Sequence, residues 1–233
     1  MLFARTLRIS LLFLCAAGMS LPQDPLAGLH GALPLTVGDR WIYDTEIRDG
    51  VDTHIEVQHW VQQDTTMAVE WIPEGVLIRR KVSVQQPAVL SSSIRIPEES
   101  NILVRGSCIY YLQDFYRWDS KLHDLDVAFR TALNHGETLP DVCFPLRQGQ
   151  TWSVPNLREQ VWTVAGKGPK NPDDPVSAAE QSWRFEASLA SGDENLVWFQ
   201  EGVGVTASRT FHHGTYHDER VRLLRFEPAN SNR

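Results

Sequence analysis

The feature that most constrains the fold is the regular spacing of short, strand-like runs that begins near residue 40 and continues almost to the last residue. Clusters of Gly, Pro and polar residues, such as Pro73-Glu74-Gly75, separate neighbouring runs. Runs of this length and spacing are typical of sandwiches and barrels. The sequence therefore predicts an all-β protein, an antiparallel meander that forms a sandwich or an open barrel. The predicted strands cover residues 41–47, 55–59, 66–72, 75–84, 88–96, 101–112, 159–165, 181–189, 195–200, 204–211 and 215–226.

One segment, residues 119–133, fits two patterns. Leu122, Leu125, Phe129 and Leu133 have helical spacing, but part of the same set also fits one face of a strand. We favour a helix, so the predicted fold contains at most one short helix.

Two connections are predicted from their residue types. Asp49-Gly50 lies between alternating runs, and both positions tolerate positive φ, so it is predicted as the turn of the first hairpin. Residues 166–179 are rich in Gly and Pro and include Asp173-Asp174, which predicts an exposed loop that is either an insertion or a lid.

One short motif occurs twice. Residues 33–41 read Leu-Pro-Leu-x2-Gly-x2-Trp, and residues 144–152 read Phe-Pro-Leu-x2-Gly-x2-Trp. Each copy combines a Pro-stiffened entry, a Gly-permitted turn and a Trp that opens a strand. We interpret this as two similar β halves, at residues 21–140 and 141–233. Residues 1–20 precede both halves and are predicted below to be a signal peptide.

The first twenty residues are predicted to be a signal peptide. Arg5 and Arg8 precede an apolar run at residues 9–17, and small residues follow it. The run is shorter than the roughly 20 residues that span a bilayer, and no transmembrane segment is expected elsewhere. The predicted location is periplasmic or extracellular. Lipidation at Cys15 remains an alternative, although Leu14 is bulky for such a site.

The cysteines predict a disulfide, and the net charge bears on the kind of partner. Removal of the signal would leave Cys108 and Cys143, an even number in an oxidising compartment, and a disulfide between them is favoured over two unpaired thiols. The formal net charge of −7, without a basic stripe, argues against nucleic acid as a partner.

Three short motifs carry a resemblance to a known group of proteins. They are Leu33-Pro34-Leu35-x2-Gly38-x2-Trp41-x-Tyr43, Pro145-Leu146-x2-Gly149-x2-Trp152, and Trp198-Phe199-x2-Gly202-Val203-Gly204. Together they resemble a loose group of bacterial exported β proteins of unknown function. The resemblance implies a β fold and export, and it implies no activity and no functional residue. Leu33 stands where the group has an aromatic residue, and Thr206 where an apolar one is expected.

The cluster that best fits a metal site is near the end of the chain. His212, His213, His217 and Asp218 combine imidazole and carboxylate, the ligand types of zinc. Adjacent His212 and His213 would point to opposite faces of a strand, and no HExxH spacing occurs, so a solvated hairpin is favoured over a metal site.

Other chemistry-bearing patterns are weak. No GxSxG, P-loop, GxGxxG or EF-hand motif occurs, and the acidic pairs Asp124/Asp126 and Asp173/Asp174 are typical of solvated surface. Aromatic residues gather at Tyr110, Tyr111, Tyr116 and Trp118, either as core or as a ring-lined ligand surface.

These observations favour an exported binding or interaction module without a cofactor. A non-catalytic function is favoured over an enzymatic one. Its predicted partner is an unknown small molecule or an envelope protein. The alternatives are a metal-dependent hydrolase that uses the histidine cluster and a structural cell-envelope component.

Overall fold

The computed structural model describes residues 29, 31–51, 54–85, 96–112, 117–138, 140–153, 161–177, 180–188, 193–212 and 216–229. Several predictions from the sequence concern residues outside this set: the signal peptide at 1–20, Cys15, residues 88–95 of one strand, Tyr116 and His213. Within the described residues the chain is built from antiparallel strands and one short helix, so the all-β prediction is confirmed.

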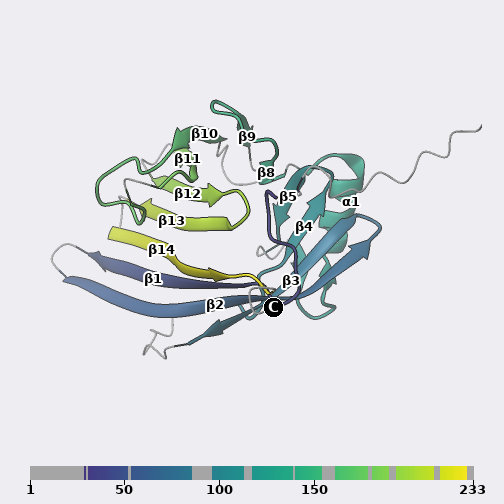
Figure 1. Ribbon diagram of the computed structural model, residues 1–233, viewed down its shortest axis with the longest axis horizontal. Helices are drawn as coiled ribbons and strands as arrows, with labels where there is room; N and C mark the ends of the chain where they lie inside the picture. Colours follow the sequence, from purple (N-terminus) through teal and green to yellow (C-terminus); the bar gives the residue numbers. More distant parts are fainter. Residues whose placement is uncertain are drawn as a thin grey trace, which may run out of the picture.

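One antiparallel sheet of 12 strands dominates the fold (Figure 1). Its strands are β1 (Arg40–Val51), β2 (His54–Ile72), β3 (Gly75–Val84), β4 (Ile102–Arg105), β5 (Cys108–Tyr111), β8 (Val142–Cys143), β9 (Thr151–Ser153), β10 (Val161–Lys167), β11 (Trp183–Ser188), β12 (Glu194–Gln200), β13 (Gly204–His212) and β14 (Tyr216–Glu227). A separate hairpin consists of β6 (Trp118–Asp119) and β7 (Asp124–Leu125), and the helix is α1 (Val127–His135).

The strand order is a meander that begins in the second half of the chain. It runs from β9 through β14, continues with β1 through β5, and ends at β8. The central pair, β1 and β14, joins the first strand of the sequence to the last, with Arg40 opposite Glu227. One sheet therefore passes through both predicted halves, and its edge strands β8 and β9 leave it open.

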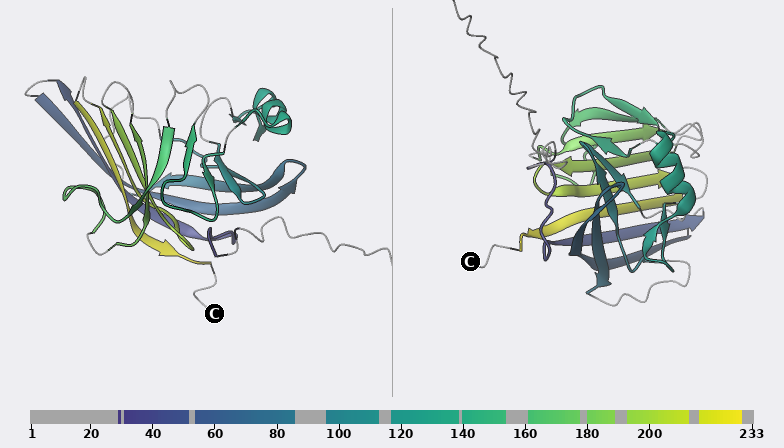
Figure 2. Two further views of the ribbon diagram at one scale, coloured as in Figure 1. Left: turned by 90° about the horizontal axis from the view of Figure 1, so that it is seen from above. Right: turned by 90° about the vertical axis from the view of Figure 1, so that its right-hand side faces the viewer.

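The sheet is strongly curved, so that its two ends face each other across a concave side (Figure 2). Long strands β1 and β2 form the middle of the curve, with β3–β5 on one wing and β10–β13 on the other (Figures 1 and 2). The architecture is an open half-barrel.

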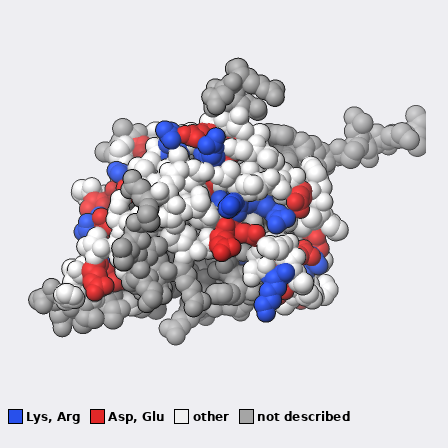
Figure 3. Space-filling view, turned by 90° about the horizontal axis from the view of Figure 1, so that it is seen from below, with Lys and Arg blue, Asp and Glu red and all other residues white. Residues whose placement is uncertain are grey.

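The outer surface carries both signs of charge. Figure 3 shows basic and acidic side chains interspersed on one face, without a broad area of a single sign among the described residues. On the central strands, Glu46 pairs with Arg48 at 2.7 Å, and Asp44 pairs with Arg222 at 3.2 Å. Such exposed pairs add little stability and give no focused field for a nucleic acid.

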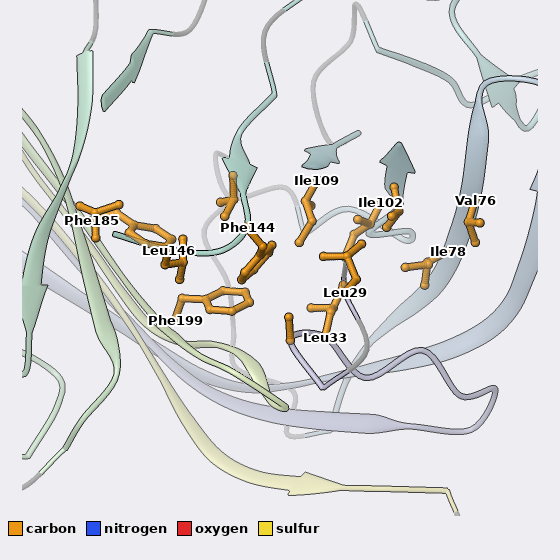
Figure 4. Close-up of a cluster of buried hydrophobic side chains, with 14 residues drawn as sticks. Leu29, Leu33, Val76, Ile78, Ile102, Ile109, Phe144, Leu146, Phe185 and Phe199 are labelled. Atoms are coloured by element: carbon orange, nitrogen blue, oxygen red, sulfur yellow. The ribbon is translucent and has the colours of Figure 1, made fainter. Parts of the chain in front are cut away.

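The main hydrophobic core lies inside the curve (Figure 4). Phe185 and Phe199 enter it from one wing, and Ile78, Ile102 and Ile109 enter it from the other. Leu33 and Leu146, from the two copies of the repeated motif, lie in the same cluster and are both buried. The two motifs therefore help to hold the wings together.

The two copies of the motif also share one local turn. Gly38 N–H donates to the carbonyl of Thr66 on a neighbouring strand at 2.8 Å, and Gly149 N–H donates to the carbonyl of Val164 at 2.8 Å. Both glycines have positive φ, +95° and +81°. This conformation is the one that Gly adopts without strain.

The helix covers the outer face of β3–β5. Asp126 caps its N-terminus by accepting hydrogen bonds from Ala128 N–H and Phe129 N–H at 2.9 and 3.1 Å. Phe129 and Leu133 are buried against Leu77 and Leu103 of the sheet. The helix predicted at 119–133 is thus correct for its second part only, because β6 and β7 occupy residues 118–125. Among the described residues, no helix has the length and hydropathy needed to cross a bilayer.

The first hairpin is present, but its predicted turn is wrong. Asp49 and Gly50 lie inside β1, opposite Glu56 and Ile55 of β2, and the strand continues to Val51. A Cβ on Gly50 would lie 2.3 Å from the carbonyl oxygen of His54. The glycine is thus needed because two backbones approach closely, not because the chain turns there.

Candidate binding cavity

Side chains of the central strands alternate between the two faces of the curved sheet. On β1, Tyr43, Thr45 and Ile47 point to the concave side, and Asp44 and Glu46 point outward to their ion pairs. This is the period of two that any β-strand has, and it separates the outer ion pairs from the side chains that line the inner face.

A cavity of about 630 Å³ lies on the concave side, next to the hydrophobic core. It lies between strands from both halves of the chain. The side chains and glycine that line it are Leu33, Tyr43, Thr45, Ile47, Asp49, Trp60, Gln62, Asp64, Arg80, Ile96, Pro97, Ser100, Tyr111, Val197, Gly204, Val205, Ser208, His217, Glu219 and Val221.

Apolar side chains form about half of the cavity wall. Ile47 from β1, Trp60 from β2 and Val221 from β14 line it; Trp60 and Val221 lie directly opposite Thr45, and Ile47 is two residues farther along β1. Val205 contacts both this cavity and the core cluster, so the core forms one end of the cavity. Small-molecule sites usually combine apolar walls with placed polar groups, and this cavity contains both.

The most unusual of these polar groups is Arg80. It lies on β3 opposite Thr66, and only 7% of it is exposed. Its guanidinium carbon is 3.8 Å from the centroid of the Trp41 ring, a cation–π contact. Its Nε and Nη2 atoms are buried and have no hydrogen-bond partner among the described residues. A buried cation without a hydrogen-bonded anion is costly, so Arg80 is the residue of this cavity most in need of a ligand.

The acids and phenols near Arg80 do not pair with it. Asp64 is buried and accepts a hydrogen bond from Gln62 at 2.8 Å, and its burial raises its pKa. Burial also raises the pKa of Tyr43, and raises that of Tyr111 to about 12. Both phenols are therefore neutral at physiological pH, and the Tyr43 hydroxyl donates to the carbonyl of Val205 at 3.1 Å.

Trp60 provides a second buried donor without a partner. Its indole is 4% exposed, and no described residue accepts a hydrogen bond from its Nε1. Buried indole N–H groups usually have an acceptor. Trp41, by contrast, donates its Nε1 proton to the carbonyl of Val203 at 2.6 Å, which links the first and last motifs of the sequence.

The rim of the cavity contains a row of titratable groups. The imidazole of His217 is hydrogen-bonded through Nδ1 to Asp49, and its Nε2 lies 4.0 Å from Glu219. Burial raises the pKa of Glu219, His217 opposes this effect, and Asp49 adds to it. The rim therefore holds two carboxyl groups around one imidazole.

The residues predicted as metal ligands are only partly brought together. His212 and His217 lie directly opposite each other on β13 and β14, so they share a face of the sheet. Asp218 is buried on the other face, in ion pairs with Arg209 at 3.1 Å and Arg220 at 2.6 Å. His212 is hydrogen-bonded to Asp193. Within the described residues, no three His, Cys, Asp or Glu side chains form a group that could hold a metal ion.

The other predicted residues have structural roles. The Cys108–Cys143 disulfide is present. Tyr110 and Tyr111 point to opposite faces, Tyr110 under α1 and Tyr111 into the cavity. Trp118 packs beside α1.

The predicted acidic pairs bind arginines or cap the helix. Asp124 pairs with Arg130 at 2.6 Å, and Asp126 caps α1. In the predicted loop, Asp173 and Asp174 both bind Arg209. That loop packs on the outer face, where Gly168 accepts a hydrogen bond from the indole of Trp198 at 2.9 Å.

Sequence reasoning missed Arg80, Trp60 and Asp64. A signal for Arg80 does exist in the sequence. Val76, Ile78, Arg80 and Val82 occupy every second position of one strand, so a charged residue stands where the alternation places a buried apolar one.

The sequence matches no family model and no curated protein. Several solved structures are similar in shape. One is an inferred exported protein with a YmcC-like fold from Bacteroides fragilis, at 10% identity and a TM-score of 0.38, covering 84% of this chain and 98% of that one. Another is an inferred lipoprotein from Parabacteroides distasonis, at 11% identity and a TM-score of 0.38; the match covers 84% of this chain and 97% of that one. A third is an inferred outer membrane lipoprotein-sorting protein domain from Vibrio parahaemolyticus, at 11% identity and a TM-score of 0.30; the match covers 84% of this chain and 87% of that one.

Proposed function

We propose that this protein is an exported, non-catalytic binding module that holds a small molecule with an apolar body in its concave cavity. The observation that carries the proposal is the cavity of about 630 Å³, whose wall includes the apolar side chains of Ile47, Trp60, Val205 and Val221. This volume lies within the range of roughly 300–1,000 Å³ that is common for ligand sites.

Two features support the exported part of the proposal. Disulfides such as Cys108–Cys143 form and persist in oxidising compartments. The residue pattern at 1–20 is that of a secretory signal.

The test is native mass spectrometry of protein exported under its own N-terminal segment. We expect a bound organic mass on the wild type and its loss in Ser208→Trp, because Ser208 lines the cavity and an indole there would fill it. Val57→Trp is the matched control, since Val57 is 58% exposed.

Equal ligand retention in the two variants would place the ligand elsewhere and contradict the proposal. Stoichiometric co-purification of an envelope protein, with no small molecule, would favour the structural alternative. The spectrum also reports signal cleavage and any lipid on Cys15.

A further inference from the structure

Arg80 lines the cavity, and two of its N–H donors, Nε and Nη2, are buried and have no partner among the described residues. We propose that the cavity binds a carboxylate attached to an apolar body, and that Arg80 holds the carboxylate. This inference rests on the proposed function and names the class of ligand.

The geometry of the guanidinium favours a carboxylate. Its Nε–H and one Nη2–H bond lie along the same edge of the planar group and point in parallel, so they match the two oxygens of a carboxylate. The Trp41 ring lies against the face of the guanidinium at 3.8 Å. Stacking on a face leaves the edge free and holds the group in one orientation, which reduces the entropy lost when a ligand binds.

The acids of the protein that lie near Arg80 are engaged elsewhere. The carboxylate of Asp39 accepts hydrogen bonds from Thr36 N–H and Ala229 N–H, both at 2.9 Å. Asp64 accepts from Gln62. Arg80 interacts with both acids only through space. Neither acid therefore accepts a hydrogen bond from the two donors.

The other charges of the cavity favour a single negative charge on the ligand. Asp49, Asp64 and Glu219 line the same cavity as Arg80, and these acids repel a dianion more than a monoanion. A carboxylate carries one charge, which the one guanidinium balances. The Nε1–H of Trp60, which has no acceptor in the described part of the chain, offers a further donor to a polar ligand atom.

The experiment compares three ligands of equal chain length by isothermal titration calorimetry: decanoate, decanol and decyl phosphate, each below its aggregation limit. We expect the wild type to bind decanoate about ten-fold or more tightly than decanol, because hydrogen bonds to charged groups are the stronger ones. Arg80→Met should reduce the decanoate affinity to that of decanol and leave decanol binding unchanged. Arg80→Lys keeps the charge but loses the planar arrangement of donors, so its affinity for decanoate should lie between those of the wild type and Arg80→Met.

The matched control is Arg79→Met. Arg79 is the neighbouring residue on β3, and its guanidinium lies 3.7 Å from Glu70 and 3.9 Å from Glu99. It does not line the cavity, so this variant should bind decanoate as the wild type does.

The outcomes separate this inference from the proposed function. If decanol and decanoate bind equally to the wild type, or if Arg80→Met keeps the preference for decanoate, the inference is wrong and the cavity still binds apolar molecules. If decyl phosphate binds more tightly than decanoate, the ligand class is a phosphate and the inference is overturned. If none of the three binds, the proposed function fails with it.

A second readout needs no ligand. Because an unpaired buried charge destabilises the folded state, the melting temperature of ligand-free Arg80→Met should equal or exceed that of the wild type. A melting temperature several degrees lower would show that Arg80 is satisfied within the protein, and would overturn the inference.

Discussion

Cys108 and Cys143 lie directly opposite each other in the ladder between β5 and β8, and a disulfide joins them. β8 is an edge strand of two residues. So short a strand forms few hydrogen bonds with its neighbour, because only two positions of β8 are paired with β5. The disulfide therefore fixes the edge of one wing just before the chain crosses to β9 at the other edge.

Loss of this disulfide should destabilise the protein strongly. The bond closes a loop across 35 positions of sequence, and loop-closure entropy assigns it about 3–4 kcal/mol. We expect Cys108→Ser/Cys143→Ser to lower the free energy of unfolding by about that amount in urea titrations. Wild type unfolded in reducing buffer should match the variant. An unchanged midpoint in both cases would mean that the sheet edge does not depend on the bond.

The repeated turn allows a comparison of two equivalent glycines. Gly149 has φ +81°, and a Cβ added to it would meet no described atom within 4 Å, so the cost of a side chain there is backbone strain alone. We expect Gly149→Ala to lower stability by about 1–2 kcal/mol and Gly149→Asn by less, because Asn tolerates this conformation. Gly38→Ala should cost more, since its Cβ would also lie 3.2 Å from Ala229. Thermal unfolding of the three variants tests the order.

Much of the fold could be predicted from the sequence, because local rules and tertiary packing agree there. Leu125, Phe129 and Leu133 recur at helical spacing, and all three are buried in one cluster with the outer face of the sheet. The prediction was misled at its start by Leu122, which is 69% exposed, and by Leu125, which is buried but lies in β7 and not in the helix. The Asp49-Gly50 turn failed because a close approach of two strands requires glycine as strongly as a turn does.

The candidate site could be predicted less well, because it depends on which strands become neighbours. Tyr43, Arg80 and Val205 are far apart in sequence, and they meet only because the curved sheet brings three strands around one cavity. The histidine cluster shows that residues close in sequence need not lie together. His212 and His217 share a face through cross-strand pairing, and Asp218, adjacent in sequence to His217, is on the other face.

The metal-site prediction is testable with the histidines that the structure does describe. His212 and His217 are each hydrogen-bonded to an aspartate, and Asp218 is held by two arginines. We therefore expect wild type and His212→Ala/His217→Ala to contain the same low amount of zinc after equilibration with zinc and dialysis, measured by inductively coupled plasma mass spectrometry. One zinc per wild-type chain that is lost in the variant would support the metal-dependent hydrolase.

Two adjacent acids on β14 should give opposite dependences of stability on pH. The pKa of Glu219 is raised above its ordinary value of 4.5, chiefly by burial, so the folded state holds this proton more tightly than the unfolded state does. Its stabilising contribution is present below pH 4.5 and is lost as the pH rises through the folded-state pKa. Glu219→Gln removes this loss. We expect the stability of the variant to increase relative to wild type as the pH rises from about 4.5 to 7 in urea titrations.

Asp218 should behave in the opposite sense and in a different pH window. Burial alone would raise its pKa, but hydrogen bonds from Arg220 and Arg209 outweigh burial and hold the pKa below the ordinary value of 3.8. Its contribution is therefore present above pH 3.8 and is lost as the pH falls through the folded-state pKa. The stability difference between wild type and Asp218→Asn should stay constant from about pH 4.5 to 7 and shrink at lower pH. If both variants gave the same slope, net charge rather than these contacts would control the response, and the opposite directions of the two pKa shifts would be wrong.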